Sequence, residues 1–161
     1  LGGRVRWQRP ETMHLTLKFI GDLDDQAVPD AIAALGEVAA GSASFEMVVE
    51  GLSGFPPHGT PRVVHVPVAE PTGMLEQLQK NIDRALSRQV GMDREGRKYI
   101  PHITLGRVKD RSKAPSLEEM AETLADDSFG HCSVGSFILF KSDLTPDGAV
   151  HTPIHEFEFK G

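Results

Sequence analysis

Residues 101–107 read PHITLGR, and the HITL part of this stretch has a close copy, HLTL, at residues 14–17. A proline lies shortly before each copy and a glycine follows it. In both copies polar and apolar residues alternate with a period of two, which is the pattern of a half-buried β-strand. We therefore predict one strand over residues 13–20 and another that begins at the second motif.

In a strand, side chains two residues apart point to the same face. The histidine and threonine of each copy should share one face, and the leucine and isoleucine side chains should pack on the other. A single His-x-Thr strand is usually a half-buried histidine with a satisfied hydrogen bond, but its repetition favours one two-sided site. Imidazole titrates near neutrality, so a pair of histidines can supply a general base and a general acid together. His14 and His102 are the predicted catalytic pair.

The composition is that of an ordinary soluble globular protein. The chain has 161 residues, of which 39% are hydrophobic and 25% are charged, and we expect a single domain over residues 1–161. No apolar run approaches the length that a membrane span needs. The one cysteine, Cys132, cannot form an internal disulfide, which favours a reducing compartment such as the cytoplasm. We expect a cytoplasmic monomer that has no contact with membranes.

The net charge of −6 argues against a protein that coats nucleic acid nonspecifically, yet the cations are unevenly placed. Of 17 lysines and arginines, 11 lie near the two motifs: Arg4, Arg6, Arg9 and Lys18 near the first, and Arg94, Arg97, Lys98, Arg107, Lys109, Arg111 and Lys113 near the second. Clusters of this kind are usually solvated faces. The alternative interpretation is that they steer an anionic substrate to the motif pair.

Hydrophobic periodicity predicts three helices around the motifs. They are expected over residues 24–40, with Pro29 in the first turn and Gly41 at the stop, over residues 72–90, and from Ser116, where Glu119 completes a capping box. The residues expected to face inward are Ala27, Val28, Ile32, Leu35 and Val38, then Met74, Leu75, Leu78, Ile82 and Leu86, then Leu117, Met120, Ala121 and Leu124.

Further strands are predicted over residues 4–8, 45–55, 62–68, 129–139 and 154–159, with a turn at 145–148. The strands over 45–55 and 62–68 are expected to be neighbours. This order of strands and helices predicts an α+β domain in two half-similar lobes, each of which begins at a motif strand.

Three stretches carry a resemblance to a known family: WQRPETMHLTLKFIG at 7–21, GFPPHGTPRVVHVPV at 54–68, and PHITLGR at 101–107. They resemble the 2H phosphoesterase superfamily and, within it, the bacterial and archaeal RNA 2′,3′-cyclic phosphodiesterases, formerly called 2′-5′ RNA ligases. The resemblance runs nearly end to end. It implies a bilobal α+β fold with pseudo-two-fold halves, in which two antiparallel sheets line a central cleft, helices lie outside, and each lobe supplies one His-x-Thr strand.

The resemblance also implies an activity. Such enzymes open a 2′,3′-cyclic phosphate at an RNA end to a 2′-phosphate, without a metal or cofactor, and some join RNA through 2′-5′ bonds. By analogy His102 is the base and His14 the acid, although the sequence alone leaves that direction open. Thr16 and Thr104 would donate hydrogen bonds to the nonbridging phosphate oxygens. Arg107 matches the phosphate-contacting position of the family, a task that suits its fork of donors.

Phe19 stands in the first copy where Arg107 stands in the second, so the two halves are not equivalent. Two alternatives remain open: a relative that cleaves 2′-5′ linked oligonucleotides or small cyclic nucleotides, and a module that binds nucleotides or RNA ends without turnover. No Walker loop, GxSxG elbow or Rossmann fingerprint is present. No Cys, His or carboxylate spacing of a zinc site is present either, so we predict no metal.

Five further histidines lie outside the two motifs. His58, His65, His131, His151 and His155 show no partner pattern and are expected at the surface or in packing, although the resemblance implies aromatic residues at positions 65 and 151. Phe19, Phe55 and Tyr99 are expected in the core or the cleft wall, and Trp7 in the wall. Lys18 faces either the cleft or a solvated strand edge. Pro101 and Gly106 are expected to shape strand ends. Family members usually begin with a further strand and helix before Trp7, so we expect the chain to be part of a longer protein.

Overall fold

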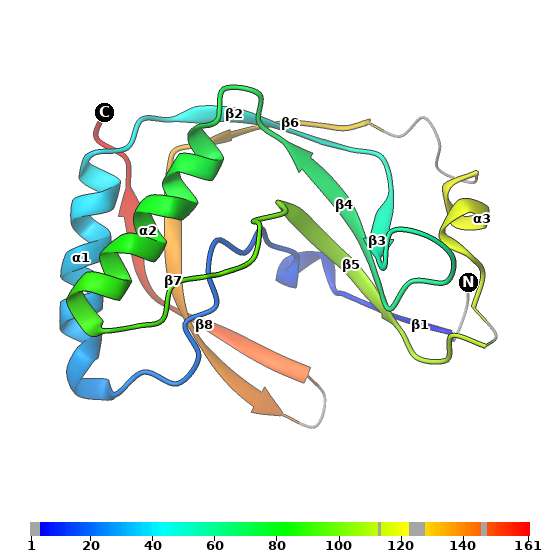
Figure 1. The fold of residues 1–161 in the computed structure, drawn as a ribbon, viewed down its shortest axis with the longest axis horizontal. Helices are drawn as coiled ribbons and strands as arrows, with labels where there is room; N and C mark the ends of the chain where they lie inside the picture. The colour runs from blue at the N-terminus through cyan, green and yellow to red at the C-terminus, as the bar shows by residue number, and fades with distance from the viewer. Residues whose placement is uncertain (1–3, 113, 123–127, 146–147) are drawn as a thin grey trace. The chain divides into compact units, whose positions relative to one another are not determined.

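A computed structural model describes residues 4–112, 114–122, 128–145 and 148–161 (Figure 1). The chain divides into two compact units. Unit 1 contains Leu1–Thr16, Met47–Pro71 and Ile100–Cys132, and unit 2 contains Leu17–Glu46, Thr72–Tyr99 and Ser133–Gly161. Each unit is therefore assembled from three separate stretches of chain. That residues 1–161 form a single domain stays a prediction.

Unit 1 is built on an antiparallel sheet. Its elements are β1 (Val5–Trp7), a 3-10 turn (Pro10–Thr12), β3 (Ser53–Phe55), β4 (Val63–Ala69), β5 (His102–Val108) and α3 (Leu117–Ala121), with most of β2 (Phe45–Glu50) and β6 (Ser128–Val134). The strand order is β1-β5-β4-β2-β6, and β3 pairs with β4 beside this path. In Figure 1, β5 lies between β1 and β4. Both neighbours of β5 pair with it antiparallel.

Strand β4 shows why this sheet forms. Its alternate residues Val64, Val66 and Val68 are buried on one face, where β-branched side chains pack well. Burial of each valine contributes about 1.5–3 kcal/mol to the free energy of unfolding. The other face of β4 carries Val63, His65 and Pro67, and it is the face on which the candidate site lies.

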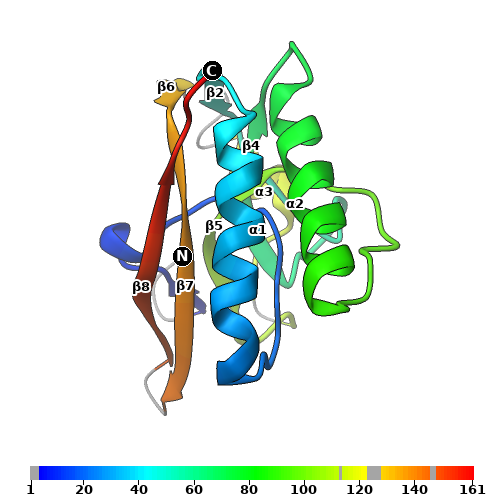
Figure 2. The same cartoon turned by 90° about the vertical axis from the view of Figure 1, so that its left-hand side faces the viewer.

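Unit 2 combines two helices with a hairpin. Its elements are a 3-10 turn (Asp25–Ala27), α1 (Val28–Ala40), α2 (Met74–Val90), β7 (Ser136–Thr145) and β8 (Gly148–Glu158). Helix α1 packs against both α2 and β8, as Figures 1 and 2 show. The packed stripe of α2 is Leu75, Leu78, Ile82 and Leu86, at helical spacing. On α1 the small side chains of Ala31 and Ala39 flank Leu35 and let the neighbouring elements approach closely.

The structure confirms the α+β class and most of the predicted elements. The helices over 24–40 and 72–90 are present, with Pro29 in the first turn of α1 and Gly41 at its C-cap. The capping box of Ser116 and Glu119 begins α3. The turn predicted at 145–148 includes Pro146 and Asp147, which lie outside the described residues, as do Lys113 and Leu124.

Four predicted strands differ markedly from the observed ones, and the strand predicted over 154–159 is the second half of β8, which begins at Gly148. The segment 45–55 is two strands, because Gly51 has a positive φ of 73° and turns the chain between β2 and β3. The segment 129–139 is likewise divided at Gly135 between β6 and β7. Residues 13–20 do not form a strand, and only Leu15 makes a β-bridge there. The chain passes from unit 1 to unit 2 after Thr16, so the segment leaves the sheet after that one bridge.

Candidate active site

The two motif segments lie next to each other in unit 1. Leu15 forms an antiparallel bridge with Ile103 of β5. Antiparallel register then sets His14 beside Thr104 and Thr16 beside His102. The resemblance implies one motif from each lobe, whereas the division into units falls within the first motif: His14–Thr16 lie in unit 1 with the whole of the second motif, and Leu17 begins a stretch of unit 2. The 3-10 turn separates β1 from the first motif, so the same stretch of chain meets β5 twice.

All four polar side chains of the motifs share one face of this arrangement. The bridging residues Leu15 and Ile103 point to the opposite face, and residues on either side of a bridge point away from it. His14 and His102 are diagonal neighbours, a relation that typically separates Cα atoms by about 7–8 Å.

Both histidines are oriented by the same local hydrogen bond. His14 Nδ1 lies 2.8 Å from the carbonyl oxygen of Thr12, and His102 Nδ1 lies 2.7 Å from the carbonyl oxygen of Ile100. A carbonyl oxygen only accepts, so Nδ1 donates in each ring and carries the proton when the ring is neutral. Nε2 is then the nitrogen that takes up or releases a proton in each histidine.

A β-bulge sets the direction of Arg107. His65 pairs with Thr104 and Val64 with Gly106, so Leu105 is an extra residue on β5. Regular alternation would put Arg107, five residues after His102, on the opposite face. The bulge reverses the alternation, and Arg107 pairs with Val63 on the face that carries His65 and Thr104. From β1, Arg6 pairs with Arg107 and joins the same face.

Gly106 lies inside β5, next to the bulge, and not at a strand end, and β1 approaches it closely. A Cβ atom at this position would lie 2.8 Å from Val5 Cγ1 and 3.0 Å from both Arg6 O and Trp7 Cε3. We expect Gly106→Ala to lower the free energy of unfolding by about 1–3 kcal/mol, the usual cost of overpacking. Urea unfolding should show this loss, whereas Gly96→Ala, which meets no atom within 4 Å, should change stability little. Equal stability of the two variants would contradict the close approach of β1.

His65 contacts the site, a role that the sequence did not indicate. Its ring centroid is 4.9 Å from that of His102 and 4.4 Å from that of Phe55, and Phe55 meets the His102 ring edge-on at 5.1 Å. His65 is only 2% exposed, and its Nδ1 has no hydrogen-bond partner among the described residues. Burial, and secondarily the charge of His102, lowers the pKa of His65 to about 4. The expectation of a packing residue is therefore confirmed, and the ring that His65 packs against is that of His102.

The lowered pKa of His65 makes stability depend on pH. Between pH 6.5 and about 4 the unfolded chain binds a proton at this imidazole and the folded chain does not, so stability falls as the pH falls through that window. We expect a loss of about 3 kcal/mol relative to His65→Phe, which keeps a ring but cannot take up a proton. Urea unfolding of both proteins at pH 7 and pH 4 measures this difference. Parallel losses in the two proteins would show that His65 is not buried in its neutral form.

The predictions for the other aromatic residues have different outcomes. Phe55 lies at the site, as described above, whereas Phe19 is 83% exposed and so does not belong to the core. Trp7 is partly exposed and pairs with Gly106 at the edge of the sheet. Burial raises the pKa of the Tyr99 phenol well above its usual value, in agreement with a packed side chain.

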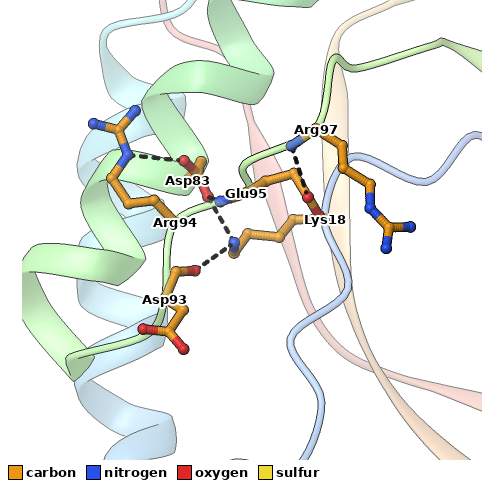
Figure 3. Close-up of polar contacts among 6 residues, drawn as sticks. All are labelled: Lys18, Asp83, Asp93, Arg94, Glu95 and Arg97. Carbon is orange, nitrogen blue, oxygen red and sulfur yellow. Dashed lines mark hydrogen bonds and ion pairs between the residues drawn. The ribbon is translucent and has the colours of Figure 1, made fainter.

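Lys18 neither faces the site nor lies at a solvated edge. Its Nζ is 2.6 Å from Asp83 Oδ1 of α2, and both side chains are nearly fully buried in unit 2 (Figure 3). Lys18 also donates to the carbonyl oxygen of Asp93 at 3.2 Å. Asp83 further accepts from Arg94 Nε and from the backbone N–H of Glu95, each at 3.0 Å. Through Lys18 this cluster fixes the chain just after the first motif. Through Arg94 and Glu95 the same carboxylate also fixes part of the charged loop that precedes the second motif.

The Asp83 carboxylate is the centre of the cluster. Burial by itself would raise the pKa of Asp83, but hydrogen bonds from Lys18, the Glu95 N–H and Arg94 outweigh it and lower the pKa to about 2. Asp83 is therefore ionised over the whole range in which proteins are usually studied.

The described residues include neither a cluster of metal ligands nor a membrane-spanning helix. In this part of the chain, no group of three or more His, Cys, Asp or Glu side chains is arranged to hold a metal ion. No helix there has both the length and the apolar character needed to cross a membrane.

Comparison with known proteins identifies the family. A family model of the 2′-5′ RNA ligase superfamily matches residues 7–145. The chain is 28% identical over 156 residues to the RNA 2′,3′-cyclic phosphodiesterase of Aquifex aeolicus, across 97% of this chain and 82% of the relative. It is 32% identical over 154 residues to the protein of the same name from Archaeoglobus fulgidus, across 96% of this chain and 84% of the relative. The chain belongs to the 2′-5′ RNA ligase superfamily.

A solved structure agrees with this assignment. The protein TT0787 of Thermus thermophilus superimposes with a TM-score of 0.81 at 26% identity, covering 99% of this chain and 85% of that chain. The mixed α+β fold with antiparallel sheets is therefore shared with a solved structure.

Proposed function

We propose that this chain is an RNA 2′,3′-cyclic phosphodiesterase that uses two histidines and no metal. The relatives in Aquifex and Archaeoglobus carry that name, and both align along most of this chain. The observation that carries the proposal is the bridge between Leu15 and Ile103, which brings two Nδ1-anchored imidazoles to one face of one sheet. Its substrates would be RNA ends or nucleotides with a 2′,3′-cyclic phosphate.

The proposed reaction follows from the two Nε2 atoms. His102 removes a proton from a water molecule, whose oxygen forms a bond to phosphorus. The bond between phosphorus and the 3′ oxygen breaks, and His14 gives that oxygen a proton. The products are a 2′-phosphate and a free 3′ hydroxyl. At the end of the reaction His102 is protonated and His14 is neutral, the reverse of their protonation states at the start. If the 5′ hydroxyl of a second RNA took the place of water, His102 would remove its proton, the 5′ oxygen would bond to phosphorus and the bond to the 3′ oxygen would break, which forms a 2′-5′ bond with the same groups.

Three further residues are proposed to hold the phosphate. The hydroxyls of Thr16 and Thr104 flank the two imidazoles in register and would donate to the nonbridging oxygens. Arg107 presents a permanently charged fork of donors on the same face. Donors that are already positioned contribute most where negative charge develops during the reaction.

The experiment that tests the proposal is hydrolysis in the presence of EDTA. A 2′,3′-cyclic mononucleotide and an oligoribonucleotide with a cyclic phosphate end should both yield 2′-phosphate products. Turnover of only a 2′-5′ linked oligonucleotide would assign the chain to another substrate. Binding without any turnover would make it an RNA-end binding module, and abolition by EDTA would contradict the metal-free mechanism.

The single cysteine supports a cytoplasmic protein, which we include in the proposal together with the expectation of a monomer.

A further inference from the structure

Unit 1 contains a cavity that the proposed reaction does not use. Its volume is about 430 Å³, within the usual range of small-molecule sites, and it is lined by Phe55, Pro56, Arg62, Val63 and Arg111. The wall has two kinds of surface, an apolar one formed by the Phe55 ring, Pro56 and Val63, and a cationic one formed by two guanidinium groups.

The two arginines are held differently. Arg111 donates from Nε at 3.1 Å and from Nη2 at 2.8 Å to the carbonyl oxygen of Thr60, which fixes its guanidinium plane. The backbone of Arg62 is fixed between β3 and β5, by its N–H to Phe55 O at 2.6 Å and by its carbonyl to the Val108 N–H at 2.9 Å. Within the described part of the chain, no carboxylate forms an ion pair with either arginine. Both positive charges are therefore available to an anion from solution.

The cavity continues the face of the candidate active site. Phe55 pairs with Val63, and Val63 pairs with Arg107, so these three side chains follow one another across β3, β4 and β5. Phe55 also contacts the ring of His102 directly. A chain molecule whose terminal phosphate lies at His102 and Arg107 can thus extend past Val63 into the cavity without leaving this face.

We propose that this cavity binds the nucleotide immediately 5′ of the terminal one, with its base against Phe55 and its phosphodiester on Arg62 and Arg111. This inference rests on the proposed function. An aromatic ring beside cationic groups is the combination that single-stranded nucleic acids bind, because every base has a π-face and every nucleotide a phosphate. A mononucleotide lacks a second nucleotide that could occupy this cavity. The cavity therefore makes the site prefer an RNA end over a free cyclic nucleotide.

The test compares two substrates at several salt concentrations. One is a cyclic mononucleotide, and the other is a short oligoribonucleotide with the same terminal nucleotide and a 2′,3′-cyclic phosphate. For Arg62→Gln and Arg111→Gln we expect KM for the oligonucleotide to rise about tenfold each, the scale of one charged hydrogen bond. The slope of log KM against log salt should fall by about one for each variant. Rates on the mononucleotide should stay unchanged, and they also report that the variants are folded.

Arg88→Gln is the matched control, because Arg88 is an exposed arginine on α2 in unit 2. It should leave both substrates and the salt slope unchanged. Equal losses on the two substrates, or no loss on the oligonucleotide in either variant, would overturn the cavity assignment while leaving the proposed function intact. If wild type turns over neither substrate, the cavity is tested by binding. The affinity for a labelled oligoribonucleotide that ends in a 3′-phosphate is then measured by fluorescence anisotropy. Unchanged affinity of Arg62→Gln in that measurement would reject the cavity.

Discussion

His14→Ala and His102→Ala should each lower kcat/KM for a cyclic-phosphate substrate by at least about 100-fold, the scale of losing a general acid or base. Each variant keeps the other imidazole, the threonines and Arg107, so substrate should still bind. We therefore expect the loss mainly in kcat. The effect should be similar for the two variants, because the bridge between Leu15 and Ile103 gives both rings the same kind of position.

His131→Ala is the control for this pair, because His131 is exposed on β6 and away from both motifs in sequence. It should keep wild-type kinetics. Removal of both His14 and His102 should cost little more than removal of one, since each step needs the two groups together. A variant that loses either histidine and retains more than a tenth of the wild-type kcat would contradict the paired mechanism.

Asp83→Asn should destabilise the protein by about 3–5 kcal/mol, because it leaves the Lys18 ammonium buried without a compensating carboxylate. The loss should also shrink as the pH falls. The folded pKa of Asp83 is about 2, below the ordinary value of 3.8, so its ionised form contributes stability above that ordinary value and loses it as the pH falls toward 2. Urea unfolding of wild type and variant at pH 7 and at pH 2.5 measures both effects.

The chain offers an ion pair of the same length as a control. Lys80 and Glu76 on α2 are 2.6 Å apart, but both side chains are more than half exposed. Glu76→Gln should change stability little, because exposed pairs are screened by water and salt. If Asp83→Asn were as mild as Glu76→Gln, the Lys18 cluster would not be the anchor between α2 and the chain after the first motif.

Local patterns in the sequence predict the local structure well. The stripe of Leu75, Leu78, Ile82 and Leu86 identifies α2, and the pair Ser116 and Glu119 identifies the start of α3, because both signals depend only on residues within a few turns of each other. The two motifs are equally local. His-x-Thr alternation correctly puts His102 and Thr104 on one face of β5, whereas the first motif makes only the bridge at Leu15, and only the structure shows that the two segments meet.

Features that depend on distant pairing were not predictable in this way. Simple alternation puts Arg107 on the wrong face, since the bulge at Leu105 exists only in the register of β5 with β4; the isolated Gly106 within the strand was the available hint. Asp83, the partner of Lys18, is 65 residues away in the sequence, and hydrophobic periodicity cannot predict such a contact. His65 acquires its role only because β4 lies beside β5.

The pH dependence of kcat/KM for a cyclic-phosphate oligonucleotide tests the paired histidines most directly. Two imidazoles that act in opposite protonation states should produce a bell-shaped profile across the neutral range, with one limb for each ring. His14→Ala and His102→Ala should each lose one limb of that profile, and not the same one. A wild-type profile that is flat across this range, or one that keeps both limbs after either substitution, would contradict the account.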